Sequence, residues 1–280
     1  MKIAVIGAGA MGGGIAQTFA QNEGYDVLLC SSSVESARRG KQKIEKRLMS
    51  RVSKGKMTEE CAQKILERIE TGELGDCALC DVVIESVPEV MEKKQTLLRE
   101  LDSICKADCI FASNTSSLSI TEMAAGITHP VVGMHFFNPA PVMKLVEIAA
   151  GLNTPEETVH TVVELAKKLG KVPVEVKDNA GFVVNRILIP MINEAIGLYA
   201  DGVASAKGID AAMKLGANHP MGPLELGDFI GLDICLAIME ALYSETGDGK
   251  YRPHPLLRKM VRGGWLGVKS GKGFYRYGEK

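Results

Sequence analysis

The first half of the chain alternates between short apolar runs and stretches of helical periodicity. Five of the apolar runs have the length and composition of strands covered on both faces, at residues 2–6, 25–30, 81–87, 109–113 and 130–134. Helical patterns separate several of them, for example over residues 91–101. This alternation predicts a doubly wound α/β domain with a mainly parallel sheet.

The pattern changes near residue 180. Residues 142–149 and 171–177 are two further β-type runs, with a helix predicted to begin at Asn153 between them. From Phe182 onward the periodicity is mostly helical. We therefore expect a dinucleotide-binding domain over residues 1–180 and an all-α domain over residues 181–280.

A glycine-rich turn directly follows the first predicted strand. Gly7, Gly9 and Gly12 have the spacing G-x-G-x-x-G and precede a predicted helix, which is the order of a Rossmann-type dinucleotide site. The turn and the helix start predict cofactor contacts at Gly7, Gly9, Ala10, Met11 and Gly12. The alternative is a glycine-rich turn that binds nothing.

The end of the second strand bears on which cofactor is used. An acid at this place accepts hydrogen bonds from the adenosine ribose and repels a 2′-phosphate. This chain has Ser31 there, and Arg38 and Arg39 follow. The pattern favours NADP over NAD, or tolerance of both; alternatively, Ser31 caps the next helix.

Composition and charge exclude several classes of function. The formal net charge of −1 gives no general attraction to nucleic acid or to an anionic membrane, and no apolar run is long enough to span a bilayer. Seven scattered cysteines indicate free thiols in a reducing, cytoplasmic compartment. Cys77 and Cys80 form an isolated C-x-x-C, which is a poor zinc site, so no metal is expected.

The helical region at about residues 34–70 is rich in basic side chains. Usually such a region is a solvated helical hairpin. Beside a dinucleotide site, a basic arm can also hold a second phosphorylated ligand.

Polar residues near the ends of predicted strands carry the candidate chemistry. Asn114, Ser116 and His135 each follow a strand, where ligands bind in parallel sheets. A neutral imidazole at His135 can accept a hydroxyl proton while hydride leaves the carbon, and Glu147 can orient that imidazole. Ser116 and Asn185 can stabilise a developing oxyanion. Taken alone, a histidine after a strand is more often structural.

Six stretches of the chain closely resemble the short-chain L-3-hydroxyacyl-CoA dehydrogenases. They lie at residues 7–12, 113–121, 133–147, 181–186, 213–223 and 271–275, in family order across nearly the whole sequence. The His-Phe-Phe-Asn-Pro block at residues 135–139 is far more specific than the glycine turn. The resemblance implies reversible hydride transfer between NAD(P)H and C3 of a short 3-ketoacyl-CoA such as acetoacetyl-CoA.

The resemblance also implies roles for single residues. His135 matches the catalytic base, Glu147 its partner, and Ser116 with Asn185 the substrate-positioning pair. Further positions match cofactor contacts, namely Glu89, Lys94, Ser116, Asn138 and Lys269, with Asn114 expected on the cofactor side as well. Lys54 is the best match for the grip on the coenzyme A phosphates. Family members that use NAD carry an acid at the place of Ser31, so cofactor preference is not inherited from the resemblance.

The sequence leaves two alternative functions open and also predicts how the chain assembles. The chain can instead be a dehydrogenase of a free 3-hydroxy acid, or a non-catalytic nucleotide-binding protein on the same fold. Residues 187–192 and 232–239 carry much apolar surface for a small domain, and the family dimerises through this region. We therefore expect a homodimer, unless these segments are simply core.

Overall fold

The computed structural model describes residues 1–278, which divide into two compact units. Unit 1 spans Met1–Asp178 and unit 2 begins at Asn179. Each unit has its own apolar core. The division lies close to the boundary expected after residue 180.

Unit 1 is built on an eight-stranded sheet with the strand order β3-β2-β1-β4-β5-β6-β7-β8. Neighbouring strands are parallel except β6 and β7, which run antiparallel. The strands are β1 (Lys2–Ile6), β2 (Asp26–Cys30), β3 (Ile69–Gly72), β4 (Val82–Glu85), β5 (Ile110–Ser113), β6 (Val131–Phe136), β7 (Leu145–Ala150) and β8 (Val172–Lys177). The predicted Rossmann-type doubly wound α/β class is confirmed.

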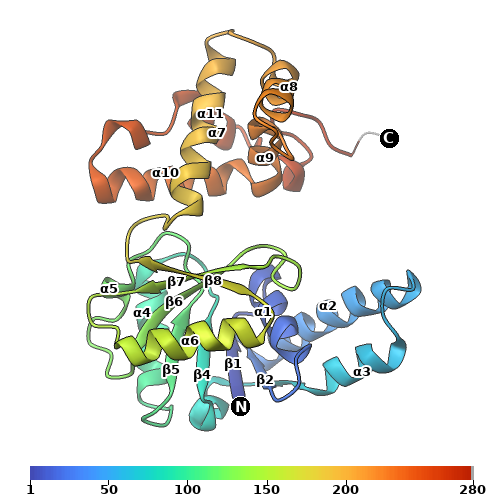
Figure 1. Cartoon of the computed structure of the whole chain (residues 1–280), viewed down its shortest axis with the longest axis vertical. Coiled ribbons are helices and arrows are strands. Elements are labelled where there is room, and N and C mark those ends of the chain that lie inside the picture. The colour runs from blue at the N-terminus through green and yellow to red at the C-terminus, as the bar shows by residue number, and fades with distance from the viewer. Residues whose placement is uncertain (279–280) are drawn as a thin grey trace. The chain divides into compact units, whose positions relative to one another are not determined.

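Helices cover both faces of this sheet. Helices α1 and α6 lie across one face and α4 across the other, while α2 and α3 form a hairpin that projects at one side (Figure 1). The helical elements are α1 (Ala10–Ala20), α2 (Val34–Ser53), α3 (Glu59–Glu67), η1 (Leu74–Leu79), α4 (Met91–Asp102), α5 (Ile120–Met123) and α6 (Glu156–Lys168). Because the central strands are covered on both sides, β4 is buried at every position, and its sequence reads as a continuous apolar run ending in Glu85.

Three details of the sequence prediction are wrong. Residues 69–70 begin β3 rather than ending the helical arm, because Ile69 pairs with Val27 at the sheet edge and is fully buried. Helix α6 begins after Pro155 and not at Asn153, since the Thr154 hydroxyl instead donates to the Val131 carbonyl at 2.6 Å. His135 lies within β6 rather than after it, because pairing with β7 extends the strand through Phe136.

Unit 2 is all-helical, as predicted. Its helices are α7 (Val184–Ala200), α8 (Ala206–Gly216), α9 (Pro223–Ile230), α10 (Leu232–Thr246) and α11 (Pro255–Arg262), with short turns η2 (Gly249–Tyr251) and η3 (Val268–Ser270). The buried Asp228 carboxylate accepts hydrogen bonds from the amides of Phe274 and Tyr275, which fixes the C-terminal segment onto α9. Among residues 1–278, no helix has the length and apolar character needed to cross a membrane.

Candidate functional site

The turn between β1 and α1 has the shape that a dinucleotide site requires. Gly7 has a φ of +114°, and a Cβ on it would lie 2.4 Å from the Ser86 carbonyl oxygen. A Cβ on Gly12 would lie 1.8 Å from the Gly7 carbonyl oxygen, so any side chain there would push the helix off the strand. Both glycines are therefore required by the turn itself.

Gly9 differs from its two neighbours. A Cβ on Gly9 would meet no described atom within 4 Å, so open space faces this residue. Gly9 is also the N-cap of α1 and supplies no side-chain cap, and amides in the first turn of a helix lack intrahelical partners. The turn thus fits a pyrophosphate, which the amides around Gly9, Ala10 and Met11 would hold.

The end of β2 carries no acidic side chain. The Ser31 hydroxyl donates to the Ser36 hydroxyl at 3.1 Å and is half-buried. The cap of α2 is Ser33, whose hydroxyl accepts from the Ser36 amide, so the reading of Ser31 as the helix cap is wrong. Arg39 forms an ion pair with Glu35 at 3.6 Å.

His135 and Glu147 lie directly opposite each other on the antiparallel strands β6 and β7. The Nδ1 atom of His135 is 2.8 Å from Oε2 of Glu147, and the two residues are 6% and 1% exposed. A buried carboxylate on Nδ1 places the proton there and leaves Nε2 as the atom that can accept another. This pair can therefore act as an oriented general base.

The imidazole lies at the same edge of the sheet as the glycine turn. β1, β4, β5 and β6 are consecutive parallel neighbours, so their carboxyl ends share one edge. Three strand spacings correspond to about 14 Å between β1 and β6. Ligand sites of open parallel sheets occur at this edge.

A network of charged side chains is anchored on β4 and β5, which lie between β1 and β6 in the sheet. The Lys94 ammonium, 1% exposed, donates to both carboxylate oxygens of Glu85 at 2.7 and 2.8 Å and pairs with Glu89 at 3.2 Å. The Ser113 hydroxyl donates to Glu85 at 2.6 Å. The Lys94 ammonium is thus occupied by the Glu85 and Glu89 carboxylates, and its effect on the site is to hold these two side chains in place.

Glu89 in turn holds the loop that carries Ser116. Its Oε1 accepts hydrogen bonds from the Thr115 hydroxyl at 2.7 Å and from the amides of Ser116 and Ser117 at 2.8 and 3.1 Å. Burial raises the pKa of Glu89, but Lys94 and these hydrogen bonds lower it by more, so the net pKa is lowered and the group is an anion. The loop that carries the Ser116 hydroxyl is therefore fixed around the Glu89 carboxylate, whose side chain is 36% exposed.

The loop after β6 is fixed by residues on both sides. The Asn114 side-chain oxygen accepts from the Phe136 amide at 2.8 Å, which ties β5 to β6 beside His135. Asn138 is exposed in the loop that follows. The buried Lys171 ammonium donates to the carbonyls of Ala140 and Met143 at 2.6 and 2.8 Å and holds that loop in place.

Sequence reasoning missed three of these anchoring residues. Glu85, Ser113 and Lys171 are buried, yet none was a candidate. A signal was present for Glu85, since an acid that ends an otherwise apolar strand is seldom buried without a partner. Nothing in the sequence marks Lys171, because its partners are backbone carbonyls.

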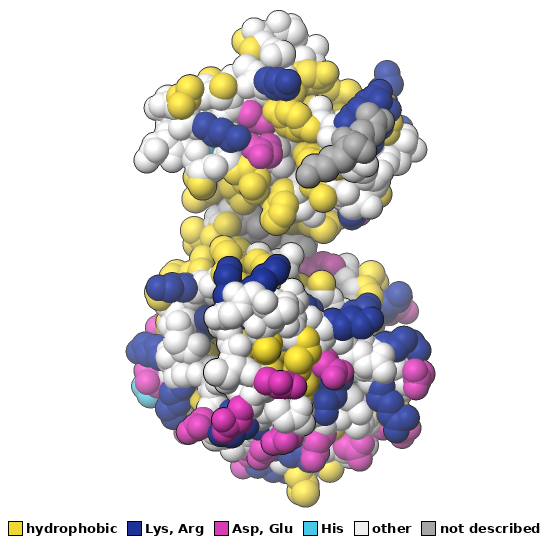
Figure 2. All heavy atoms as spheres, turned by 90° about the vertical axis from the view of Figure 1, so that its right-hand side faces the viewer, with side chains coloured by type: hydrophobic (Ala, Val, Ile, Leu, Met, Phe, Trp, Pro, Cys, Tyr) yellow, Lys and Arg dark blue, Asp and Glu magenta, His cyan; other side chains and the backbone are white. Residues whose placement is uncertain are grey.

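The remaining candidates lie in the basic arm and in unit 2. Lys54 is exposed at the C-terminal end of α2, and on this face of unit 1 basic side chains lie interspersed with acidic ones (Figure 2). Asn185 is half-buried in the first turn of α7. Lys269 forms an ion pair with Asp233 at 2.5 Å.

The C-x-x-C pair shows the properties of structural thiols. Cys77 and Cys80 are buried. A hydrogen bond with Cys30 and burial raise the pKa of Cys77, and a hydrogen bond with Cys77 and burial raise the pKa of Cys80. Among residues 1–278, no cluster of side chains is suited to hold a metal ion.

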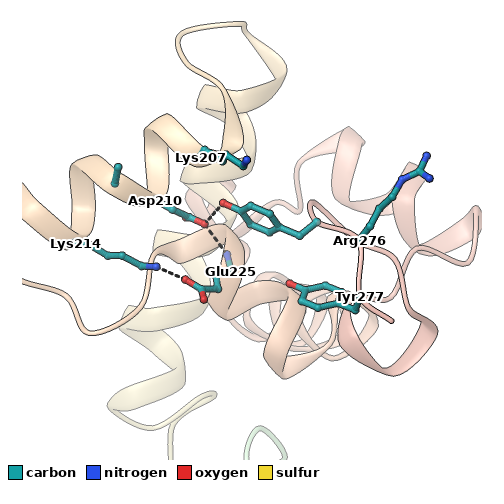
Figure 3. A pocket seen from close by; sticks show the side chains of 8 residues that line it. Lys207, Asp210, Lys214, Glu225, Arg276 and Tyr277 are labelled. Carbon is teal, nitrogen blue, oxygen red and sulfur yellow. Dashed lines mark hydrogen bonds and ion pairs between the residues drawn. The ribbon is translucent and has the colours of Figure 1, made fainter. Parts of the chain in front are cut away.

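A hollow of about 420 Å³ in unit 2 is lined by none of the candidate residues. Its acids are already engaged, since Asp210 accepts from Tyr275 and Lys214 pairs with Glu225 (Figure 3). The lining comprises Lys207, Asp210, Ala211, Lys214, Glu225, Tyr275, Arg276 and Tyr277. These contacts hold the C-terminal segment against α8 and α9.

Comparison with known proteins gives matches over both units. The model of the 3-hydroxyacyl-CoA dehydrogenase NAD binding domain matches residues 2–179, and the model of the C-terminal domain of the same enzymes matches residues 181–277.

Individual relatives match over their full length. A 3-hydroxybutyryl-CoA dehydrogenase of Clostridioides difficile is 54% identical over 99% of both chains, and a probable one of Bacillus subtilis is 54% identical over 100% of this chain and 98% of its own. The crystal structure of the (S)-3-hydroxybutyryl-CoA dehydrogenase of Ralstonia eutropha is similar with a TM-score of 0.94, at 46% identity and 99% coverage of both chains.

Proposed function

This chain belongs to the 3-hydroxyacyl-CoA dehydrogenase family, and from that premise we propose that it interconverts acetoacetyl-CoA and (S)-3-hydroxybutyryl-CoA. It is an oxidoreductase that acts on a CH–OH group. The observation that carries the proposal is the buried His135–Glu147 pair at the carboxyl edge of the sheet.

Each side chain of the proposed site has a defined task. Nε2 of His135 takes the hydroxyl proton during oxidation and returns it during reduction, while Glu147 holds Nδ1 and stabilises the imidazolium. The Ser116 hydroxyl and the Asn185 amide bind the substrate oxygen as it gains charge. When bound, the nicotinamide cofactor supplies or accepts the hydride.

The cofactor is proposed to lie along the carboxyl ends of the strands. The amides of the glycine turn would hold its pyrophosphate, and Glu89, Asn114, Ser116 and Asn138 would contact or orient its other half. Lys94 supports Glu89, and Lys269 is a further proposed contact from unit 2.

We propose that NADP(H) is accepted at least as well as NAD(H), whose binding the family membership supports. No acid stands at the end of β2 to repel a 2′-phosphate, and Ser31 offers a hydroxyl there. The test is kcat/KM for NADH and NADPH measured side by side, in the parent protein and in Ser31→Asp. We expect Ser31→Asp to shift preference toward NADH, while a strong NADH preference of the parent contradicts the proposal.

Lys54 is proposed to contact the phosphates of the coenzyme A moiety. Its exposed ammonium lies at the C-terminal end of α2, and within residues 1–278 no acidic side chain forms an ion pair with it. We expect Lys54→Ala to raise KM for acetoacetyl-CoA and leave KM for the cofactor unchanged. Lys64→Ala is the control, since Lys64 is also an exposed cation of the arm but pairs with Glu60 at 2.7 Å.

The proposed activity is tested by cofactor oxidation with acetoacetyl-CoA, a longer 3-ketoacyl-CoA and unesterified acetoacetate. We expect the acetoacetyl thioester to be preferred, whereas preference for the free acid would favour a dehydrogenase of free 3-hydroxy acids. His135→Gln should lower kcat roughly 10²–10⁴-fold while nucleotide binding persists. The control is His160→Gln, at an exposed position of α6.

The assembly and location are also proposals. We propose a homodimer formed through unit 2, where Ile187 and Ile234 lie exposed on α7 and α10. Free thiols at all seven cysteines agree with a reducing, cytoplasmic location.

A further inference from the structure

Asp178 links the end of the sheet to the segment that follows the Ser116 loop. It comes directly after β8 and is the last residue of unit 1. Its Oδ1 atom accepts a hydrogen bond from the Ile120 amide at 2.9 Å. Its Oδ2 atom accepts from the Ser119 hydroxyl and from the Thr121 amide, both at 2.7 Å. Both carboxylate oxygens are thus directed at the start of α5.

The loop between β5 and α5 is rigid within itself. The Thr115 hydroxyl accepts a hydrogen bond from the Leu118 amide at 3.0 Å, which closes the loop on its own backbone. Helix α5 is attached to the same loop through Ser119, whose hydroxyl accepts from the Glu122 amide at 3.2 Å. A displacement at either end of this loop is therefore transmitted to Ser116, which lies inside it.

Glu89 by itself holds this loop at a single point. The hydrogen bonds that it accepts from Thr115, Ser116 and Ser117 all end on one atom, Oε1. A rigid segment that is held at one point can still turn about that point. Asp178 supplies a second attachment at the other end of the loop, and its two oxygens hold two successive amides. The two carboxylates together fix both the place and the direction of the Ser116 hydroxyl.

We propose that Asp178 is a positioning residue for the substrate, which acts through Ser116 without touching the reacting atoms. This inference rests on the proposed role of the Ser116 hydroxyl at the substrate oxygen. A donor that stabilises a developing oxyanion must point to the place where the charge appears, and a displacement of about 1 Å can cost roughly a hundredfold in rate. Asp178 contributes to kcat because it keeps the Ser116 hydroxyl at that place.

Asp178→Asn removes this anchor with almost no change of volume. Because both carboxylate oxygens face a backbone N–H, either orientation of the amide group turns its NH2 toward another donor. We expect kcat with acetoacetyl-CoA to fall roughly tenfold to a hundredfold, while Kd for NADH stays within about twofold. The matched control is Asp102→Asn, since Asp102 also accepts from two successive amides, those of Thr128 and His129, both at 3.0 Å. Those residues precede β6, and the control should keep its kcat at a temperature where both variants are folded.

Double variants of the full chain distinguish positioning from a general loss of stability. Asp178→Asn is combined with Ser116→Ala and, separately, with Asn185→Ala. Because Asp178 acts through Ser116, its effect on kcat should shrink to less than about threefold in Ser116→Ala and persist in full in Asn185→Ala. Ser119→Ala removes one of the three hydrogen bonds to Asp178 and should show the same coupling with a smaller loss, so it serves as the second variant if Asp178→Asn does not fold.

Contrary outcomes are distinct from these. Equal losses from Asp178→Asn in all three backgrounds overturn the inference, because they mean that Asp178 does not act through Ser116. Coupling to Asn185 in place of Ser116 overturns it as well. An impaired Ser116→Ala beside an unimpaired Asp178→Asn refutes the anchor alone, whereas a Ser116→Ala variant with the kcat of the parent refutes the proposed role of Ser116 and the inference with it.

Discussion

At the residue scale, the contact between the candidate base His135 and Glu147 depends on the register of β6 against β7. Antiparallel pairing of β6 with β7 places Glu147 opposite His135, so a slip of one residue would turn the carboxylate to the other face of the sheet. The sequence predicted this partnership from residue types and resemblance. The 2.8 Å contact and the burial of both groups explain why the imidazole keeps one orientation.

Glu147→Gln tests that orientation. We expect kcat to fall roughly 10²–10⁴-fold with little change in nucleotide affinity, because a neutral amide neither fixes the tautomer nor stabilises the imidazolium. Steady-state kinetics with acetoacetyl-CoA and a nucleotide titration provide the measurement. Glu175→Gln, on the exposed face of the neighbouring β8, is the control, and equal losses in both variants would argue against a specific role for Glu147.

The Asp102–His129 pair predicts a pH-dependent contribution to stability. Burial raises the pKa of Asp102, but hydrogen bonds from His129 and Thr128 lower it by more, to about 2, so its contribution is lost as the pH falls from about 4 toward 2. The raised pKa of His129 means that its contribution is complete below about pH 6.5 and is lost as the pH rises through the raised value. The pair therefore stabilises the fold most near pH 5.

Asp102→Asn is the corresponding variant. We expect its deficit in Tm relative to the parent to be largest near pH 5 and to shrink as the pH rises through the raised pKa of His129 and the imidazole loses its charge. Thermal unfolding in matched buffers across this range measures it. A deficit that does not vary with pH would mean that the side chain stabilises the turn by its neutral hydrogen bonds alone.

At the scale of single helices, strands and turns, a feature was predicted from the sequence where its cause lies in residues close together in the chain. The β1–α1 turn was predictable because Gly7 and Gly12 are required by backbone contacts that the motif encodes. Strand β3 was not, because Ile69–Gly72 is not an apolar run and Ile69 is buried by elements distant in the chain, namely β2, α1 and α2. The Glu85–Lys94–Glu89 network was missed for a similar reason, since its members are joined through space between β4, α4 and the loop before α4.

The glycine turn yields a matched pair of variants. Gly12→Ala should destabilise unit 1 by about 3 kcal/mol or more, because its Cβ would overlap the Gly7 carbonyl oxygen. Gly9→Ala meets no described atom within 4 Å, so stability should change by less than about 0.5 kcal/mol. Its methyl group would occupy the open space proposed for the pyrophosphate, so Kd for NADH should rise roughly tenfold or more.

Denaturant unfolding measures the stability of each variant, and a nucleotide titration measures its affinity for NADH. Unchanged NADH affinity in a folded Gly9→Ala variant would remove the turn from the cofactor site. Normal stability of Gly12→Ala would contradict the close contact between helix and strand.

At the scale of the whole molecule, the change of pattern near residue 180 predicted two units with separate cores. Most of the apolar surplus that suggested self-association lies inside unit 2, where Ile189, Ile192, Leu232 and Met239 are buried. Helical periodicity alone did not show which of the apolar side chains of unit 2 are exposed to solvent. The structure leaves Ile187 68% and Ile234 44% exposed, which narrows the proposed dimer surface to particular side chains.

That surface can be tested by mass in solution. We expect the parent protein to have about twice the single-chain mass of 30.1 kDa, and the double variant Ile187→Asp with Ile234→Asp to shift toward the single-chain mass. Stable interfaces bury about 800 Å² per partner, and charges placed in such a surface are left without solvent or counter-charge. Light scattering after size exclusion provides the measurement, with Leu152→Asp in unit 1 as the control because Leu152 is equally apolar and 87% exposed. A parent protein of single-chain mass at high concentration would contradict the dimer, and a monomeric Leu152→Asp variant would move the interface to unit 1.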